Sequence, residues 1–134
     1  MKRHLFTFGC LLIGLIAASG CTGVLEGKPD STNPYPNITL TTKELYDGLA
    51  FNPATVTRTE TGMLAVSQPI RARANEPLMI EYRFVWLDSA GAPISPQTGW
   101  VYKRLEPRVP ETMSANSSSK QAVDYQIHIR WARP

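Results

Sequence analysis

The residue with the most clearly defined chemistry is a cysteine that follows a short apolar segment. Residues 1–4 are basic, residues 5–18 carry no charge, and the small residues Ala18-Ser19-Gly20 lead directly to Cys21. Fourteen uncharged residues would rise ~21 Å as a helix, which is short of the ~30 Å hydrocarbon core of a bilayer. A basic start, a short apolar run and small residues before a break predict a secretory signal peptide over residues 1–20. A membrane-spanning helix is the alternative.

The segment Ala18-Ser19-Gly20-Cys21 resembles the lipobox of bacterial lipoproteins. The resemblance implies that the thiol of Cys21 receives a diacylglycerol and that signal peptidase II cuts between Gly20 and Cys21. It also implies that Cys21 then carries three acyl chains such as palmitate. Two chains already suffice for stable anchoring. Because Thr22, and not an aspartate, follows the cysteine, the resemblance implies a lipid anchor in the outer membrane with the protein facing the periplasm.

Removal of residues 1–20 would leave 114 of the 134 residues, enough for one domain with its own core. The formal charge would fall from +3 to +1, because Lys2 and Arg3 leave with the signal. An exported and nearly neutral protein has no support as a nucleic-acid binder. Cys10 lies in the signal and Cys21 would be acylated, so no disulfide is expected and the core must supply the stability.

Few residues of the mature chain suit catalysis. His128 is its one histidine, and zinc would need three or four ligands, so a surface histidine is favoured over a metal ligand or a general base. Glu81 and Asp88 are seven positions apart on one predicted strand and point to opposite faces. Glu106 and Glu111 flank a proline-containing turn and are expected to be in solvent. The sequence therefore predicts a protein that is not an enzyme and that has neither a cofactor nor a metal site.

Arginines fall on the polar faces of the predicted strands. They are Arg71, Arg73, Arg83 and Arg130, with Lys103 or Arg104 as further candidates. If their strands are neighbours, the four arginines form a basic binding face. A solvated outer sheet face is the simpler interpretation. The alternative is a site for an acidic protein, a lipopolysaccharide phosphate or a peptidoglycan carboxylate, because the forked donors of arginine suit bidentate pairing.

Strands must position these side chains. Apolar and polar residues alternate over 78–88 and again over 123–131, which predicts two half-buried strands. The buried faces are expected to carry Leu78, Ile80, Tyr82, Phe84 and Trp86 on the first strand, and Val123, Tyr125, Ile127, Ile129 and Trp131 on the second. A third strand is expected over 64–73. It contains Pro69, which lacks an amide donor and so predicts an edge strand or a bulge.

The segment after Cys21 has no apolar period and is rich in Gly, Pro, Asn, Ser and Thr. It predicts a flexible tether over residues 21–37, although Tyr35 between two prolines could instead dock on the domain. Thr41 and Glu44 have capping-box spacing, which predicts one or two helical turns ended by Gly48.

Weaker strands are expected over 49–59, 100–105 and 109–115, with a polar loop over 116–121. Six or seven short strands predict an all-β domain over residues 38–134. Its expected form is a small antiparallel β-sandwich with immunoglobulin-like topology, which we expect to be monomeric.

The segment EYRFVWLDSAGAPI (81–94), preceded by RARANEPLMI and followed by Trp100, resembles the YcfL-like family of small bacterial lipoproteins. The shared pattern falls on Tyr82-Arg83-Phe84, Trp86, Asp88 and Gly91, and residues 114–131 are similar to the last loop and strand of the family. The resemblance covers about residues 40–132 and implies a lipid-anchored periplasmic β-sandwich without an established enzymatic activity. It also implies that Phe84 and Trp86 lie in the core, and that Asp88 caps a turn in which Gly91 has a positive φ.

These observations together lead us to expect a non-catalytic binding or adaptor module, anchored in the outer membrane, with a periplasmic or envelope protein as its partner. A structural subunit of a secretion or envelope-assembly machine is one alternative. A module that binds peptidoglycan or lipopolysaccharide is another, and an enzyme that pairs His128 with a carboxylate or a serine is a third.

Overall fold

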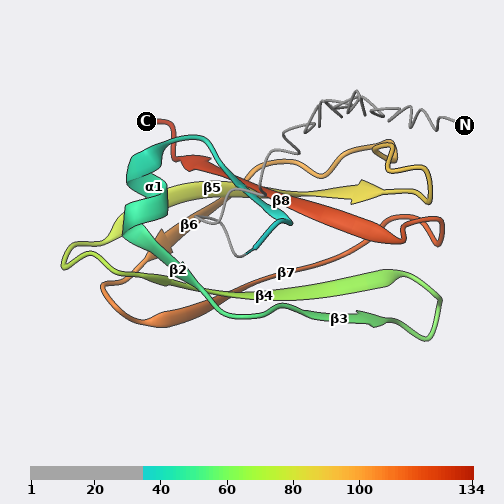
Figure 1. Cartoon of the computed structure of the whole chain (residues 1–134), viewed down its shortest axis with the longest axis horizontal. Coiled ribbons are helices and arrows are strands. Elements are labelled where there is room, and N and C mark those ends of the chain that lie inside the picture. The colour runs from blue at the N-terminus through green and yellow to red at the C-terminus, as the bar shows by residue number, and fades with distance from the viewer. Residues whose placement is uncertain (1–34) are drawn as a thin grey trace, which may run out of the picture. The chain divides into compact units, whose positions relative to one another are not determined.

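The two alternating segments form the centre of one sheet. The computed structural model describes residues 35–134, and in it β5 (Leu78–Leu87) pairs antiparallel with β8 (Asp124–Trp131) over eight residue pairs. β6 (Val101–Leu105) adds to the other side of β5, and β1 (Ile38–Leu40) lies beside β8. The strand order of this sheet, called sheet A below, is β1-β8-β5-β6 (Figure 1).

The second sheet, called sheet B, is built around β4 (Leu64–Ala72). β7 (Pro110–Asn116) pairs with one side of β4, while β2 (Leu49–Phe51) and β3 (Thr55–Arg58) pair one after the other with the opposite side. The helix α1 (Lys43–Gly48) connects β1 to β2 at one end of the two layers (Figure 1). The all-β sandwich predicted from the sequence is confirmed.

The core lies between the sheets, where the inward side chains of both meet. Ile80, Tyr82, Phe84 and Trp86 are buried on β5, as their alternation predicts, and Phe84 stacks on Trp86 with ring centroids 5.5 Å apart. On β8 the buried residues are Tyr125, Ile127 and Ile129. The prediction is wrong for Val123 and Trp131, which are 51% and 38% exposed because the former precedes β8 and the latter ends it.

The strand order is that of an immunoglobulin-type sandwich at six positions. The orders β3-β4-β7 and β6-β5-β8 correspond to strands A-B-E and C′-C-F of that fold. The place of the last strand, G, is taken here by β1, which pairs parallel with β8. The antiparallel prediction therefore fails at this one pair, because the edge position is filled from the N-terminal end of the domain.

The N-terminal part of the domain differs locally from the sequence-based expectation. Tyr35 lies in the predicted tether, but its hydroxyl donates to the main-chain oxygen of Phe51 at 2.7 Å and its ring packs edge-on against Phe51. This is the alternative in which Tyr35 docks on the domain. The N-cap of α1 is Thr42 and not Thr41, because the hydroxyl of Thr42 is the one that accepts from the Leu45 amide.

The prediction that Pro69 marks an edge strand or a bulge is wrong for β4, which is the central strand of sheet B. The interruption lies instead in the segment that pairs with this side of β4, between β2 and β3. Phe51 pairs with Ile70 and Thr55 pairs with Ser67, so residues 52–54 form a break between β2 and β3 opposite Pro69. The missing amide of the proline therefore faces a place where no strand continues.

The predicted signal peptide, the lipobox with Cys21 and most of the predicted tether lie outside the described residues. Within residues 35–134, no helix is long and apolar enough to cross a membrane.

Candidate functional site on the outer face of sheet A

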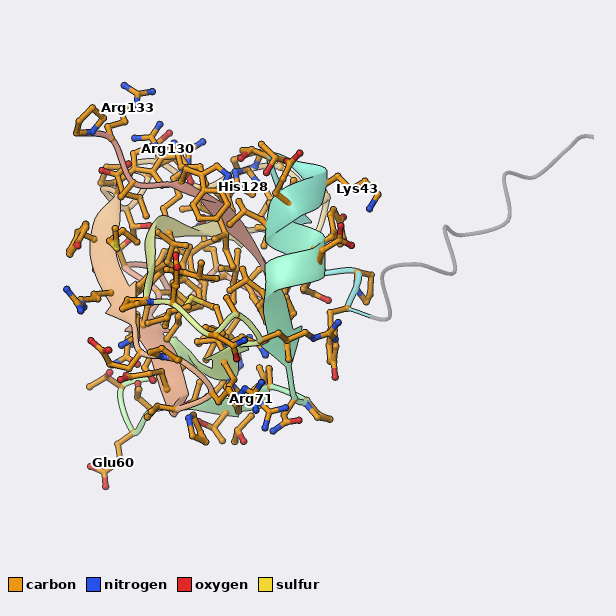
Figure 2. The ribbon with its side chains drawn as sticks, turned by 90° about the vertical axis from the view of Figure 1, so that its left-hand side faces the viewer. Lys43, Glu60, Arg71, His128, Arg130 and Arg133 are labelled. Atoms are coloured by element: carbon orange, nitrogen blue, oxygen red, sulfur yellow. The ribbon has the colours of Figure 1, made fainter. Side chains whose placement is uncertain are left out.

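The four arginines predicted to form one basic face belong to two different sheets. Arg83 on β5 and Arg130 on β8 lie on the outer face of sheet A, because each alternates with buried residues of those strands. Arg71 is exposed on the outer side of β4, and Arg73 follows β4. Figure 2 shows Arg130 and His128 on one side of the molecule and Arg71 on the other. The prediction of a single basic face is therefore wrong, because alternation fixes the face of a strand but not the sheet that contains it.

A tryptophan joins the two arginines of sheet A. The guanidinium carbon of Arg130 lies 3.8 Å from the centroid of the Trp100 ring, and that of Arg83 lies 4.8 Å from it. Both distances are within the ~6 Å range of a cation–π contact. We call the group formed by Glu81, Arg83, Trp100, His128 and Arg130 the Trp100 cluster.

One acid belongs to this cluster. Glu81 is directly opposite Arg130 in the β5–β8 register, and the Nε of Arg130 donates to the Glu81 Oε2 at 2.7 Å. The two side chains are only 20% and 18% exposed, so the ion pair is screened less than a pair in open solvent. Arg130 is thereby held in place under the ring of Trp100.

His128 lies directly opposite Arg83 in the same register, with Thr39 of β1 on its other side. Its Nε2 is 3.2 Å from the Oε1 of Gln126, which can only accept, so the Nε2 carries the hydrogen of the neutral ring. Burial, together with a smaller contribution from the charge of Arg83, lowers the pKa of His128 below its ordinary value. The imidazole is therefore neutral at pH 7, and the arginines supply the positive charge of the cluster.

The loop over residues 88–100 brings Trp100 to this place. It begins with a tight turn in which the Asp88 carboxylate accepts from the amides of Ala90 and Ala92, both at 2.9 Å, and Gly91 has a φ of 77°. The turn is the one that the family resemblance implies. The chain then returns along β5, where the Ile94 amide donates to the Trp86 oxygen at 2.8 Å and the Thr98 hydroxyl donates to the Phe84 oxygen.

Sequence reasoning did not single out Trp100 as a site residue. Because Tyr82 pairs with Val101, Trp100 continues the β5–β6 register beside Arg83. Two features of the sequence point to Trp100. It alternates with Tyr102 and Arg104 on one face of the predicted strand over 100–105, and Arg83 is at the centre of the predicted strand before it. The signals were not sufficient, because the pairing of these strands is set by the intervening loop.

Two further acids, outside the Trp100 cluster, are paired with cations of β6. Glu106 pairs with Arg104 at 2.7 Å, and Glu111 pairs with Lys103 at 2.9 Å between β6 and β7. Glu106 is 49% exposed, as expected, whereas Glu111 is 34% exposed and therefore only partly in solvent. Within residues 35–134, no group of three or more His, Cys, Asp or Glu side chains could hold a metal ion.

The arrangement is suited to binding an oxyanion. Guanidinium groups form strong charge-assisted hydrogen bonds with carboxylates and phosphates, and stacking on an aromatic ring orients them. Exposed apolar side chains flank the cluster on the same face, since Tyr102 is opposite Glu81 and 59% exposed, and Met79 is 45% exposed.

The fold and this face together define an immunoglobulin-like β-sandwich that carries a cationic and aromatic outer sheet. The sequence pattern of the DUF1425 family, described as a protein of unknown function, matches residues 37–131, and the chain belongs to this family.

Two solved structures share the fold. The Campylobacter jejuni protein cj0090 is 16% identical, with a TM-score of 0.58 over 72% of this chain and 98% of its own. A DUF1425 family member from Shewanella sp. pv-4 is 22% identical, with a TM-score of 0.56 over 64% of this chain and 80% of its own. No curated protein matches the sequence.

Proposed function

We propose that this DUF1425 protein is a YcfL-like lipoprotein, anchored in the outer membrane through acylated Cys21, and that it works in the periplasm as a non-catalytic adaptor. The domain would hold an envelope protein while the acyl chains hold the membrane. The lipobox and the signal peptide support the anchor, and the DUF1425 match supports the relation to YcfL-like proteins.

The observation that carries the adaptor proposal is the outer face of sheet A. Its most prominent side chains are arginine, tryptophan, tyrosine and methionine, which are the residue types enriched in protein–protein interfaces. The arginines and Trp100 are held by strand pairing and by stacking, so these side chains would lose little conformational entropy when a partner binds. The His128 ring on this face is hydrogen-bonded to the side-chain oxygen of Gln126.

Site-specific photocrosslinking in intact cells tests this proposal. A photoreactive amino acid at Tyr102 would report on the outer face of sheet A, and the same amino acid at Thr112 would report on the outer face of sheet B. Both positions are exposed. We expect a discrete protein adduct from position 102 that is absent from position 112.

Two results would contradict the adaptor. One is the same weak pattern of adducts at both positions. The other is a lack of any protein adduct at position 102 while the purified protein binds peptidoglycan or lipopolysaccharide, which would make the protein an envelope-glycan or lipid-binding module.

A further inference from the structure

The Trp100 cluster contains one positive charge that lacks a carboxylate partner. Glu81 is paired with Arg130, whereas the side chain of Arg83 forms no ion pair within residues 35–134. His128, opposite Arg83, adds no charge at pH 7 because its pKa is lowered. The Trp100 cluster therefore holds two guanidinium groups and a single acid.

The Nε of Arg83 is also shielded from solvent without a hydrogen-bond partner in the described part of the chain. A shielded N–H donor that lacks an acceptor is unfavourable, and a charged one more so. The ring of Trp100 contributes a cation–π contact to this guanidinium but no hydrogen-bond acceptor. An incoming oxyanion would supply the acceptor that the protein itself does not.

The surroundings of Arg83 indicate which kind of molecule brings that oxyanion. Tyr102 and Met79 are exposed on the same face and present apolar surface next to the charge. Such a mixture of arginine with aromatic and methionine side chains is typical of the binding hot spots of protein interfaces. The Glu81–Arg130 pair shows that a carboxylate fits a guanidinium of this face beneath Trp100.

We propose that Arg83 binds an acidic side chain of a protein partner that docks on the outer face of sheet A, with Trp100 as the stacking wall of the site. This inference rests on the proposed function, because it names the chemistry by which the adaptor holds its partner. The carboxylate would pair with Arg83 as Glu81 pairs with Arg130, and Tyr102 and Met79 would contact the apolar surroundings of the acid.

The chemistry of the site can be tested on the acylated protein in detergent micelles, labelled with ¹⁵N at its three tryptophans. The indole resonance of Trp100, assigned by Trp100→Phe, reports on the site. The probes are a short glutamate-containing peptide capped at both termini, its glutamine counterpart, inorganic phosphate and lipopolysaccharide. We expect the glutamate peptide to shift the Trp100 resonance and the glutamine peptide to shift it at least ~10-fold less at equal concentration, because the charge-assisted bond is lost.

Arg83→Gln should weaken binding of the glutamate peptide by about tenfold or more, with Arg83→Lys in between, since lysine keeps the charge but not the planar fork. Arg71→Gln, on the outer face of sheet B, is the matched control and should leave binding unchanged. Equal responses to the two peptides, or an unchanged affinity in Arg83→Gln, would overturn the proposal. Stronger binding of phosphate or lipopolysaccharide than of the glutamate peptide would overturn it in favour of a phosphate ligand.

The crosslinking experiment separates this inference from the proposed function. If the adduct at position 102 persists in the Arg83→Gln background, the adaptor proposal stands and the role of Arg83 is wrong. If the adduct is lost there and retained with Arg71→Gln, both stand. If no adduct forms in either background, the proposed function itself fails.

Discussion

The side chain of Gln68 donates from its Nε2 to the main-chain oxygen of Asn52 at 2.7 Å, across the break between β2 and β3. The Nε2 also donates to the oxygen of Pro69 at 2.9 Å. Asn52 is the residue that would accept from the amide at position 69, because its own amide donates to the Pro69 oxygen at 3.4 Å. Gln68, which is only 2% exposed, thus replaces the donor that the proline lacks at the centre of sheet B.

Replacing Gln68 with leucine should lower the free energy of unfolding by about 1–3 kcal/mol, because the main-chain oxygens of Asn52 and Pro69 each lose a donor in a partly buried place. Gln68→Glu should lower it further, since a buried carboxylate would face two carbonyl oxygens. Gln97→Leu is the matched control, because the Gln97 side chain makes the same kind of bond to the Ile94 oxygen at 2.7 Å in an exposed position. It should change the free energy by less than ~0.5 kcal/mol. Equal urea midpoints for Gln68→Leu and Gln97→Leu would show that the hydrogen bonds donated by Gln68 do not contribute to the stability of the domain.

Gly91→Ala should destabilise the domain by about 1–2 kcal/mol. The φ of Gly91 is 77°, and a side chain at that angle is strained even though nothing lies within 4 Å of the added Cβ. Gly99→Ala isolates this effect, because the same loop offers open space there without a positive φ. That variant should be neutral or slightly more stable. Thermal unfolding followed by circular dichroism would compare the two variants. A similar fall in melting temperature in both would show that the positive φ of Gly91 is not the cause of the destabilisation.

Trp86→Ala should cost ~3–5 kcal/mol, because the ring is 1% exposed and stacks on Phe84 in the core. Trp131 is 38% exposed at the end of β8, and Trp131→Ala should cost roughly 1–2 kcal/mol. Chemical denaturation monitored by circular dichroism avoids the change in fluorescence that both variants cause. If Trp131→Ala lowered the free energy of unfolding as much as Trp86→Ala, the assignment of Trp86 to the core and of Trp131 to the surface would be contradicted.

The lowered pKa of His128 makes part of the stability depend on pH. In the unfolded chain this imidazole titrates near its ordinary pKa of ~6.5, and in the folded protein it titrates below that. Between the two values the unfolded state binds more protons, so the free energy of unfolding falls as the pH drops through that window. The groups around the ring are Arg83 and Thr39 across the strands and Gln126 on β8.

His128→Gln should therefore flatten the pH dependence of the urea midpoint between pH 7.5 and the folded pKa. The difference between the wild type and this variant is the relevant quantity, because carboxylates titrate in both. A constant difference across that range would show that the burial of His128 has no linkage to folding.

Cys21→Ser should abolish acylation and block the cleavage that follows it, because serine lacks the thiol that accepts diacylglycerol in a lipobox. Incorporation of labelled palmitate, together with the migration of the unprocessed chain on a gel, would measure both steps. The matched control is Cys10→Ser, within the predicted signal peptide, which should leave labelling intact. Labelled palmitate in the Cys21→Ser protein would contradict maturation at this residue.

The sequence predicts those parts of the fold that depend on one strand at a time. The alternation through Tyr82, Phe84 and Trp86 identifies the buried face of β5, and the family resemblance implies the Asp88 and Gly91 turn that follows. In both cases the deciding interactions are local in the chain.

Features that depend on two distant segments were not predictable in this way. Arg71 and Arg83 have the same alternation, and only the pairing of their strands places them on opposite outer faces. Pro69 is tolerated in a central strand because Gln68 and the break at residues 52–54 are brought together there. The three residues of β1 are too few for their alternation to indicate a strand, and their partner lies near the other end of the chain.

The pairing of β1 with β8 also determines when the sandwich can be completed. Ile38 is opposite Ile127, 89 positions further along the chain. At synthesis rates of ~5–20 residues per second, the ribosome needs roughly ten seconds to add that stretch. β-hairpins form within about 1–10 μs once both of their strands exist, whereas β1, the first strand of the domain to be made, must wait for β8, the last. Until β8 is available to pair with β1, the apolar side chains of Ile38 and Leu40, which are buried in the folded domain, lack their cover.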